Sequence, residues 1–192
     1  RVYSSFNRND HVLPAAEANV LVEDGTLVYG YDAGWSDPRV VLELGTNAYG
    51  QVLVVGEYYE NDAHVEHAIK WLNGNLPETE KKERGVLHAE HEPSDIQKFR
   101  RAGFQAFPAD KALDPGISAV RRRLGTDSGG RVGLLVSDAC DNLISEFQSY
   151  KEEEVGKSAA EDHALDSLRY AIMGYDEGGG SSSGGSSSVE KA

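Results

Sequence analysis

The sequence predicts an α/β fold in which a mixed β-sheet is covered by helices on both faces. Two observations carry this prediction. Three strand patterns follow one another directly in the first third of the chain, and strand and helix patterns alternate after them. Strands joined by short turns pair antiparallel, whereas strands separated by helices pair parallel, so one sheet should contain both kinds of pairing.

The first three strands are expected to form an antiparallel meander. The stretch TLVYGYDAG at 26–34 alternates its side chains between two faces and places Asp32 at its end. RVVLELG at 39–45 and QVLVVGEYYE at 51–60 are two further strands, separated by the turn TNAYG. The meander therefore begins with a strand that presents an aspartate at its carboxyl end.

Helices and short strands alternate beyond the meander. Helices are expected at 62–72, 92–103, 114–124, 141–153 and 158–174, and strands at 84–90, 104–109 and 131–137. A meander followed by such alternation gives a mixed sheet with helices on both faces. This order of elements matches the ribonuclease H-like fold.

Length and composition favour one folded domain with a tail. The chain has 192 residues, of which 39% are hydrophobic, and this suffices for one sizeable core. The stretch GGGSSSGGSSSVEKA cannot bury a core, so we expect a folded domain at 1–176 and a flexible Gly/Ser-rich tail at 177–192. Cys140 is the only cysteine, and we interpret it as a small buried residue rather than a nucleophile.

The charge balance limits the possible partners. No apolar run approaches the ~20 residues of a membrane span, so no membrane partner is expected. The formal net charge of −13 disfavours a general nucleic-acid coat, because phosphate binding requires a basic surface. Three or four acids could hold metal ions. The remainder are typical of the acidic, lysine-poor surface of a protein that works in high salt.

The last helix carries an unusual density of charge in the stretch EDHALDSLRYAI. At about 100° per residue its leucines face the core, while Asp162, Asp166 and Arg169 lie on the opposite side with His163 at the edge. A solvated polar face is the ordinary interpretation of this pattern. The two acids four residues apart repel each other, however, and a bound cation would turn that repulsion into chelation.

Acids from distant parts of the chain should meet at one edge of the sheet. Asp32 ends the first strand, and LHAEHEP places Glu90 and Glu92 at the end of a neighbouring strand. The last helix can lay its Asp162 and Asp166 face across these strand ends. Mg2+ and Mn2+ prefer oxygen ligands, and two such ions can activate a water and stabilise the leaving oxygen of a phosphodiester.

In three blocks the chain resembles the C-terminal nuclease domain of the large terminase subunit, the DNA-packaging motor protein of tailed viruses. VYGYDAGWSDP is similar to the family's first acidic motif, and HAEHEPSDIQKFRRAGFQAFPADKALDPGISAVRRRL to its long central block. LISEFQSYK followed by EDHALDSLRYAI resembles the closing block, with its Asp-His-Ala-Leu-Asp run. The resemblance covers roughly residues 1–174 and rests on the order and spacing of the blocks.

The resemblance implies a metal-dependent endonuclease that cuts concatemeric double-stranded viral DNA during genome packaging, by two-metal-ion phosphodiester hydrolysis. Carried over by position, Asp32, Glu90 and Asp166 would be the catalytic ligands of two Mg2+ or Mn2+ ions. His163 would lie close by as a further metal ligand, and Asp162 is an alternate.

The central block departs from the family at its acidic position. Many members carry Asp-Ser-Ala-Glu-Pro there, whereas this chain has Ala-Glu-His-Glu-Pro and fills the position of the aspartate with Ala89. Glu90, one residue on, is the expected ligand, since its longer side chain can offset a small shift. Glu92 remains the alternate. Pro93 drives it into an extended conformation beside a helix amino terminus, whose positive pole offers it a structural role.

The resemblance also implies partners and a place of action. They are double-stranded DNA, the ATPase domain of the same terminase, the portal and the small terminase subunit, in the cytoplasm of a host that the acidic surface suggests is a halophile. The sequence contains no Gly-x-x-x-x-Gly-Lys-Ser/Thr loop, so the ATPase half of the family is missing. A first residue other than Met fits an excised domain.

Four basic residues are candidates for DNA contact in this acidic chain. Lys98, Arg100 and Arg101 should face outward from the helix at 92–103, and Lys111 follows a strand end where it could approach a phosphate. Surface solvation is the alternative for each of them.

Four histidines are further candidate ligands. His64 and His67 have a spacing that could hold zinc, but no third ligand is near in sequence, so an exposed helix face is favoured. His88 and His91 flank Glu90 and could line the site, although ordinary loop histidines are the favoured interpretation.

Two other functions remain open at this point. A docking domain would keep the fold without catalysis and bind the portal or the rest of the motor. A resolvase- or transposase-type nuclease would use the same fold on other substrates. The Asp-His-Ala-Leu-Asp run favours the terminase over the second of these, and retention of the acids argues against the first.

Overall fold

The computed structural model of the chain describes residues 1–23, 26–34, 36–76 and 85–179. Its centre is a seven-stranded mixed sheet in the order β1-β7-β4-β3-β2-β5-β6. The strands are β1 (Val12–Leu13), β2 (Val28–Asp32), β3 (Arg39–Thr46), β4 (Val52–Glu60), β5 (Val86–Ala89), β6 (Gln105–Pro108) and β7 (Leu134–Ser137).

The predicted meander forms the middle of this sheet. Strand β3 pairs antiparallel with both β2 and β4. On one side β5 and β6 continue parallel to β2, and on the other side β7 and β1 continue parallel to β4. The prediction of a mixed sheet built from a meander and parallel strands is confirmed.

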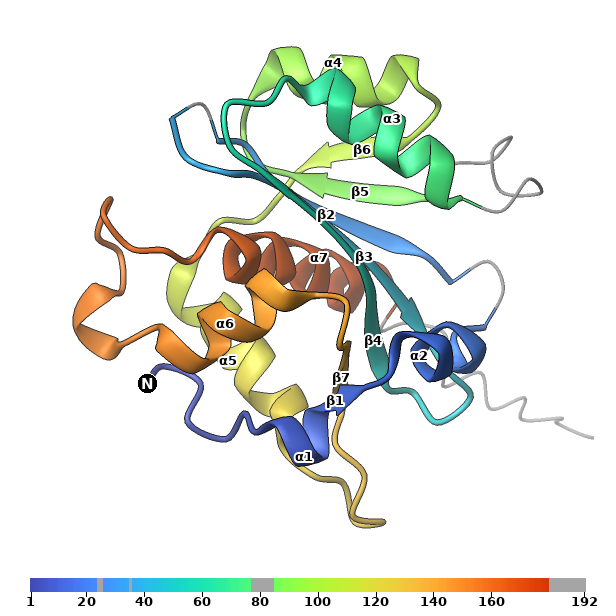
Figure 1. Cartoon of the computed structure of the whole chain (residues 1–192), viewed down its shortest axis with the longest axis vertical. Helices are drawn as coiled ribbons and strands as arrows, with labels where there is room; N and C mark the ends of the chain where they lie inside the picture. The colour runs from blue at the N-terminus through green and yellow to red at the C-terminus, as the bar shows by residue number, and fades with distance from the viewer. Residues whose placement is uncertain (24–25, 35, 77–84, 180–192) are drawn as a thin grey trace, which may run out of the picture.

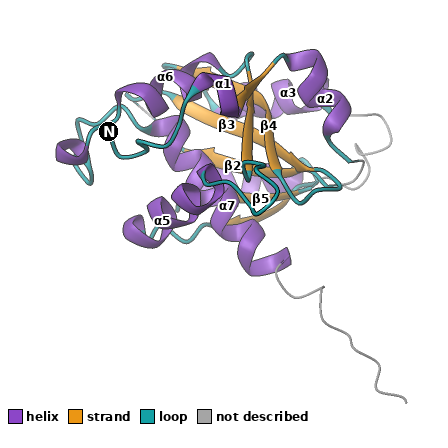
Figure 2. Ribbon diagram, turned by 90° about the horizontal axis from the view of Figure 1, so that it is seen from below, coloured by secondary structure: helices purple, strands orange, loops and turns teal. Residues whose placement is uncertain are grey.

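Helices cover both faces of the sheet, as Figures 1 and 2 show. The helices are α1 (Arg8–His11), α2 (Ala15–Leu21), α3 (Val65–Asn75), α4 (Pro93–Arg101), α5 (Leu113–Leu124), α6 (Asp141–Ser149) and α7 (His163–Gly179), with a short 3-10 turn at Glu152–Glu154. One core lies between α3, α4 and the sheet, and a larger one lies between the sheet and α5, α6 and α7. None of the helices in the described ranges is long and apolar enough to cross a membrane.

Strand alternation assigns side chains to these two cores. Tyr29 and Tyr31 are fully buried on the α3 and α4 side, whereas Val40 and Leu42 of the neighbouring strand face α7. This is the alternation expected of a strand buried on both faces. It leaves Asp32, the last residue of β2, on the α7 side.

Several elements differ from the predicted ones. The amino-terminal α1, β1 and α2 were not predicted, since they are too short for a readable period. The helix predicted at 141–153 ends at Ser149, and the last helix begins at His163 rather than at 158. It continues to Gly179, so the first residues of the predicted tail belong to α7, while 180–192 lie outside the described residues.

The close approach of α7 to β2 depends on a glycine. A Cβ added at Gly30 would lie 1.9 Å from the carbonyl oxygen of Ser167, so no larger residue fits at this position. The contact places the first turn of α7 over the carboxyl end of β2. Figure 1 shows α7 lying across the middle strands of the sheet.

We predict that Gly30→Ala destabilises the protein by about 1–3 kcal/mol or more, because the added methyl group must push α7 away from the sheet. Urea unfolding followed by circular dichroism measures this change. Gly74→Ala is the matched control. Gly74 lies in α3 with no atom within 4 Å of an added Cβ, and alanine there should stabilise the helix by up to about 1 kcal/mol. Equal stability of Gly30→Ala and the wild type would contradict the proposed tight contact.

Candidate active site

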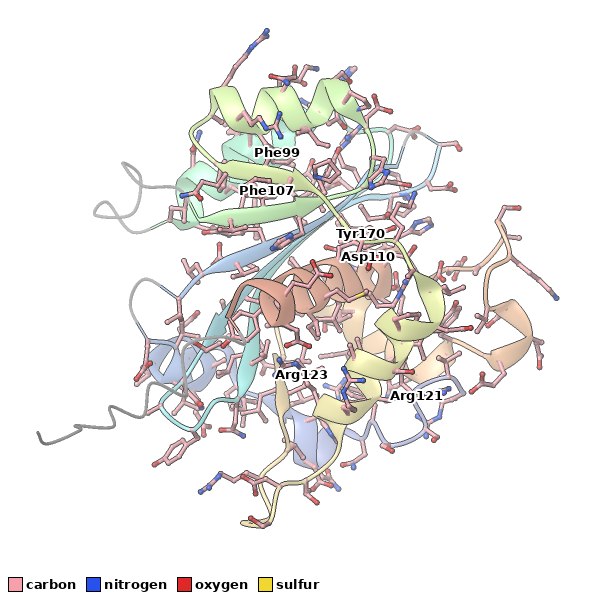
Figure 3. The ribbon with its side chains drawn as sticks, turned by 180° about the vertical axis from the view of Figure 1, so that it is seen from behind. Phe99, Phe107, Asp110, Arg121, Arg123 and Tyr170 are labelled. Carbon is pink, nitrogen blue, oxygen red and sulfur yellow. The ribbon has the colours of Figure 1, made fainter. Side chains whose placement is uncertain are left out.

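A cleft of about 430 Å³ opens where the ends of β2 and β5 meet the first turns of α7. The loop between β6 and α5 and the loop before α7 form its other walls. Figure 3 shows this region around Tyr170 and Asp110, with α5 leading away from it toward Arg121 and Arg123. The ionisable side chains that line the cleft are Asp32, Asp37, Glu90, Lys111, Lys157, Asp162, His163, Asp166, Arg169 and Tyr170.

Asp32 lies deepest among the predicted ligands, with 5% of its surface exposed. Burial raises the pKa of its carboxyl to about 7, a hydrogen bond with His163 opposes that shift, and the neighbouring carboxylates of Asp166 and Glu90 raise the pKa further. These two carboxylates are therefore near enough to Asp32 for their negative charge to repel its own. A cation in the cleft would relieve the repulsion.

His163 begins α7 and faces Asp32. Its Nδ1 lies 3.1 Å from the Asp32 carboxylate, and this hydrogen bond raises the pKa of the imidazole to about 9, so the ring is protonated at neutral pH. A protonated ring cannot ligate a cation. His163 thus donates a hydrogen bond to Asp32 in this arrangement, and it could become a ligand only by losing its proton.

Glu90 follows β5, and each of its two carboxylate oxygens has a hydrogen-bond partner. Its backbone N–H donates to the Tyr31 carbonyl at 2.9 Å, which continues the pairing of β5 with β2. One carboxylate oxygen accepts from the backbone N–H of Ala33 at 3.2 Å, and the other lies 2.7 Å from the ammonium group of Lys111. The side chain is thereby directed to the same sheet edge as Asp32.

Asp166 lies on the cleft side of α7 and forms an ion pair with Arg169, three residues on. Burial raises the pKa of the Asp166 carboxyl. The Arg169 side chain is almost fully buried between α7 and α5, where Gly116 leaves room for it. A Cβ at Gly116 would lie 3.2 Å from an Arg169 terminal nitrogen. A packed guanidinium thus orients the Asp166 carboxylate.

Each of the three predicted catalytic acids is therefore paired with a basic side chain of the chain itself. The donor types suit a hard divalent ion, since three carboxylates and one imidazole face one cleft. As the side chains stand, no group of three or more His, Cys, Asp or Glu within the described ranges could hold an ion. Each carboxylate is turned toward its own cationic partner, so ion binding requires that at least one of these contacts be exchanged.

The two alternate acids have different surroundings. Asp162 lines the cleft, where its carboxylate adds to burial in raising the pKa of the Tyr150 hydroxyl. Glu92 does not line the cleft. It immediately precedes α4, accepts from the Ser94 hydroxyl at 3.1 Å and lies in a separate pocket with Lys98. This placement favours Glu90 over Glu92 as the ligand.

Of the four predicted DNA contacts, the structure brings only Lys111 to the cleft. Lys98 is ion-paired with Glu66 at 2.8 Å, and the Arg100 guanidinium donates to the Ala106 carbonyl at 2.9 Å. Arg101 is exposed at the end of α4. None of these three residues lines the cleft.

The remaining candidates do not line the cleft. His88 packs against Gly174 of α7, and the His91 ring lies 2.8 Å from the Ala109 carbonyl oxygen. The rings of His64 and His67 are 6.1 Å apart at the start of α3. Cys140 is fully buried, as predicted. His88 lies within strand β5 rather than in the loop expected for it.

Several residues of the site escaped prediction from the sequence. Lys157 reaches the rim of the cleft from a loop, where no periodic pattern marks it. Buried Glu146 of α6 accepts a hydrogen bond from the Leu165 backbone N–H at 2.9 Å. This N–H belongs to the first turn of α7, where backbone donors lack partners within the helix. The place of Glu146 in an ordinary helical pattern carried no sign of this role. Asp37, in contrast, lies within the first acidic motif and could have been noticed.

The fold is ribonuclease H-like, and it is similar to the fold of large terminase nuclease domains. The nuclease domain of the bacteriophage P22 large terminase matches with a TM-score of 0.67, over 90% of this chain and 91% of that domain, at 16% identity. That of bacteriophage SPP1, solved with bound manganese, matches with a TM-score of 0.61, over 85% of this chain and 94% of that domain, at 17% identity.

A large terminase from a thermophilic bacteriophage matches with a TM-score of 0.69, over 89% of this chain, at 20% identity. This chain spans 43% of the length of that protein. No family model matches the sequence, and no curated protein matches it. The predicted fold class is confirmed, and the predicted resemblance to terminase nuclease domains is confirmed at the level of the fold.

The role of Glu146, which accepts a hydrogen bond from the first turn of α7, can be tested through the pH dependence of stability. Burial raises the pKa of its carboxyl to about 8, from an ordinary value of about 4.3. A raised acid pKa means that the folded state holds a proton that the unfolded state has lost. Stability is therefore full below about pH 4.3 and falls as the pH rises to about 8.

We predict that Glu146→Gln removes this part of the pH dependence, because the neutral amide can still accept from Leu165. The wild type should lose more stability than the variant between about pH 5 and 8, as measured by thermal unfolding at each pH. Glu66→Gln is the control. The exposed Glu66 has a pKa lowered by Lys98, so any difference should be small and opposite in sign. Parallel curves for Glu146→Gln and the wild type would refute the assignment.

Proposed function

We propose that this chain is the nuclease domain of a large terminase and that it cuts double-stranded DNA with the help of divalent metal ions. The observation that carries the proposal is the meeting of Asp32, Glu90 and Asp166 in one cleft, from β2, β5 and α7. The shared fold supports it, and so does the manganese bound in the SPP1 domain.

Asp32, Glu90 and Asp166 would hold two Mg2+ or Mn2+ ions, with His163 as a further ligand once it has lost its proton. Such a pair of ions supplies an activated water and stabilises the leaving oxygen of the phosphodiester. The chain's own contribution is to position these groups. Arg169 orients Asp166 from behind, and the Ala33 N–H orients Glu90.

DNA would enter the cleft past the two exposed ammonium groups at its rim. Lys111 lies on the loop between β6 and α5, and Lys157 lies on the loop before α7. Both can contact phosphates on either side of the acids. Lys98, Arg100 and Arg101 on α4 would contact DNA only where it leaves the cleft, and their contribution to binding should be smaller.

The biological setting is proposed from the same similarity. The large terminase of the thermophilic bacteriophage is longer than this chain, so an ATPase domain in the same protein would drive DNA while this domain cuts it. The cut would be made in concatemeric viral DNA in the cytoplasm of the host, next to the portal and the small terminase subunit. A halophilic host would account for the net charge of −13.

We predict that the purified chain cuts double-stranded plasmid DNA in the presence of Mg2+ or Mn2+, with little sequence preference. Chelation by EDTA should abolish cleavage, since the carboxylates need the ions to act. Gel electrophoresis of nicked and linear plasmid measures this. Activity that survives excess EDTA would refute a metal mechanism. A folded chain that binds DNA and never cuts it would favour the docking function.

Asp32→Ala and Asp166→Ala should each reduce cleavage to background while the circular dichroism spectrum remains native. Both changes remove ligands rather than core atoms. Without added metal, the melting temperature of Asp166→Ala should fall below that of the wild type, because the buried Arg169 guanidinium loses its carboxylate partner. A near wild-type rate in either variant would show that the ligand has been assigned wrongly.

Glu90→Ala should abolish cleavage, whereas Glu92→Ala should retain substantial activity. Glu90 is directed into the cleft by Ala33 and Lys111, and Glu92 lies outside it beside α4. The two variants are matched in chemistry and nearly in position. Plasmid cleavage in Mn2+ and urea unfolding compare them. A reversed ranking, with Glu92→Ala inactive and Glu90→Ala active, would overturn the assignment.

A further inference from the structure

The three ion pairs of the cleft differ in how easily the cation can leave. The Arg169 side chain is 5% exposed and the His163 side chain 18%, whereas the Lys111 side chain is 41% exposed. Removing the Arg169 guanidinium from Asp166 would require repacking against α5, where the side chain lies against Gly116. Lys111 can turn its ammonium group into solvent without disturbing a core contact.

The backbone of Lys111 is fixed even though its side chain is free to turn. The Ala109 N–H donates to the Ala89 carbonyl at 2.7 Å, which extends the pairing of β6 with β5 up to the cleft. On the other side, the Asp110 carboxylate accepts from the Ala112 N–H at 2.8 Å. The lysine therefore starts from a defined point at the rim, with a flexible four-carbon stem as its only mobile part.

An ion bound by Glu90 would compete with this ammonium group. The Lys111 ammonium nitrogen lies 2.7 Å from one Glu90 carboxylate oxygen. The other Glu90 oxygen already accepts a hydrogen bond from the Ala33 N–H. A divalent ion and an ammonium group repel each other at such close range. An ion bound to the Glu90 oxygen that faces Lys111 therefore weakens its contact with the Lys111 ammonium.

We infer that Lys111 is an exchangeable counter-ion that couples metal binding to DNA binding. A divalent ion at Glu90 displaces the Lys111 ammonium, and the displaced ammonium, still anchored at the rim of the cleft, becomes available to a phosphate of the DNA backbone. This inference rests on the proposed function. It goes beyond that proposal by assigning the coupling of the two ligands to one side chain.

The exchange has two consequences of opposite sign. Without DNA, Lys111 opposes the metal, because its contact with Glu90 must first be broken. When the divalent ion and DNA are both bound, Lys111 stabilises the complex, because its displaced ammonium group contacts a phosphate of the DNA. Coupling between two bound ligands is reciprocal, so the metal must strengthen DNA binding by the same factor by which DNA strengthens metal binding.

The first test measures Mn2+ affinity without DNA by isothermal titration calorimetry. Lys111→Met keeps the aliphatic stem and removes the charge. It should lower the Kd for Mn2+ by roughly two- to five-fold, the range set by one half-exposed ion pair. Lys98→Met is the matched control. Lys98 is also 41% exposed and also lies 2.7–2.8 Å from a glutamate, but it is away from the cleft. Its Kd for Mn2+ should equal that of the wild type.

The second test measures the Kd for a short DNA duplex with and without Ca2+, under conditions in which no cleavage product forms. The ratio of the two Kd values is the coupling. It should be at least about two-fold larger in the wild type than in Lys111→Met, and Lys98→Met should keep the wild-type ratio even if its overall DNA affinity falls.

Two outcomes overturn the inference while leaving the proposed function intact. One is Mn2+ affinity that is unchanged or weaker in Lys111→Met. The other is equal coupling in Lys111→Met and the wild type. Failure of the proposed function looks different, because a wild-type chain that neither binds Mn2+ nor cuts DNA in its presence fails before any variant is compared.

Discussion

The packing of α7 against β2 is the constraint on which the rest of the site depends. Gly30 lets the backbone of the helix reach the strand at Ser167, and this contact brings residues from the two ends of the chain together. The Asp32 carboxylate then meets His163, 131 residues away, at 3.1 Å. Without the close approach, the helix would stand farther from the sheet and Asp166 would lie out of reach of the strand ends.

Bringing acids together in a partly buried cleft is costly, and the fold offsets the cost locally. His163, Lys111 and Arg169 each pair with one of the three carboxylates. The exposure of the three cations increases from the buried Arg169 guanidinium to the half-exposed Lys111 ammonium. Such a gradation leaves most of the site rigid and lets one contact open, which suits a cleft that must accept both ions and a DNA strand.

The sequence allowed much of this fold to be predicted, because long alternating segments carry their own period. The meander and the later helices were expected at nearly the observed positions, whereas α1, β1 and α2 were missed because each is too short. Residue roles were harder to predict. Lys98 and Lys111 are equally plausible as DNA contacts by sequence, yet one pairs with Glu66 on α3 and the other with Glu90 in the cleft.

The sequence by itself determined which acids stand at strand ends and which face of the last helix is charged, because these follow from the two-residue and 3.6-residue periods of strand and helix. The tertiary structure alone decided which acids share a cleft. Glu90 and Glu92 fall on the same face of an ideal strand, but the pairing of Glu90 with Tyr31 ends there and the chain turns into α4. Contacts between distant residues depend on how α7 and the sheet pack, and no local pattern encodes that geometry.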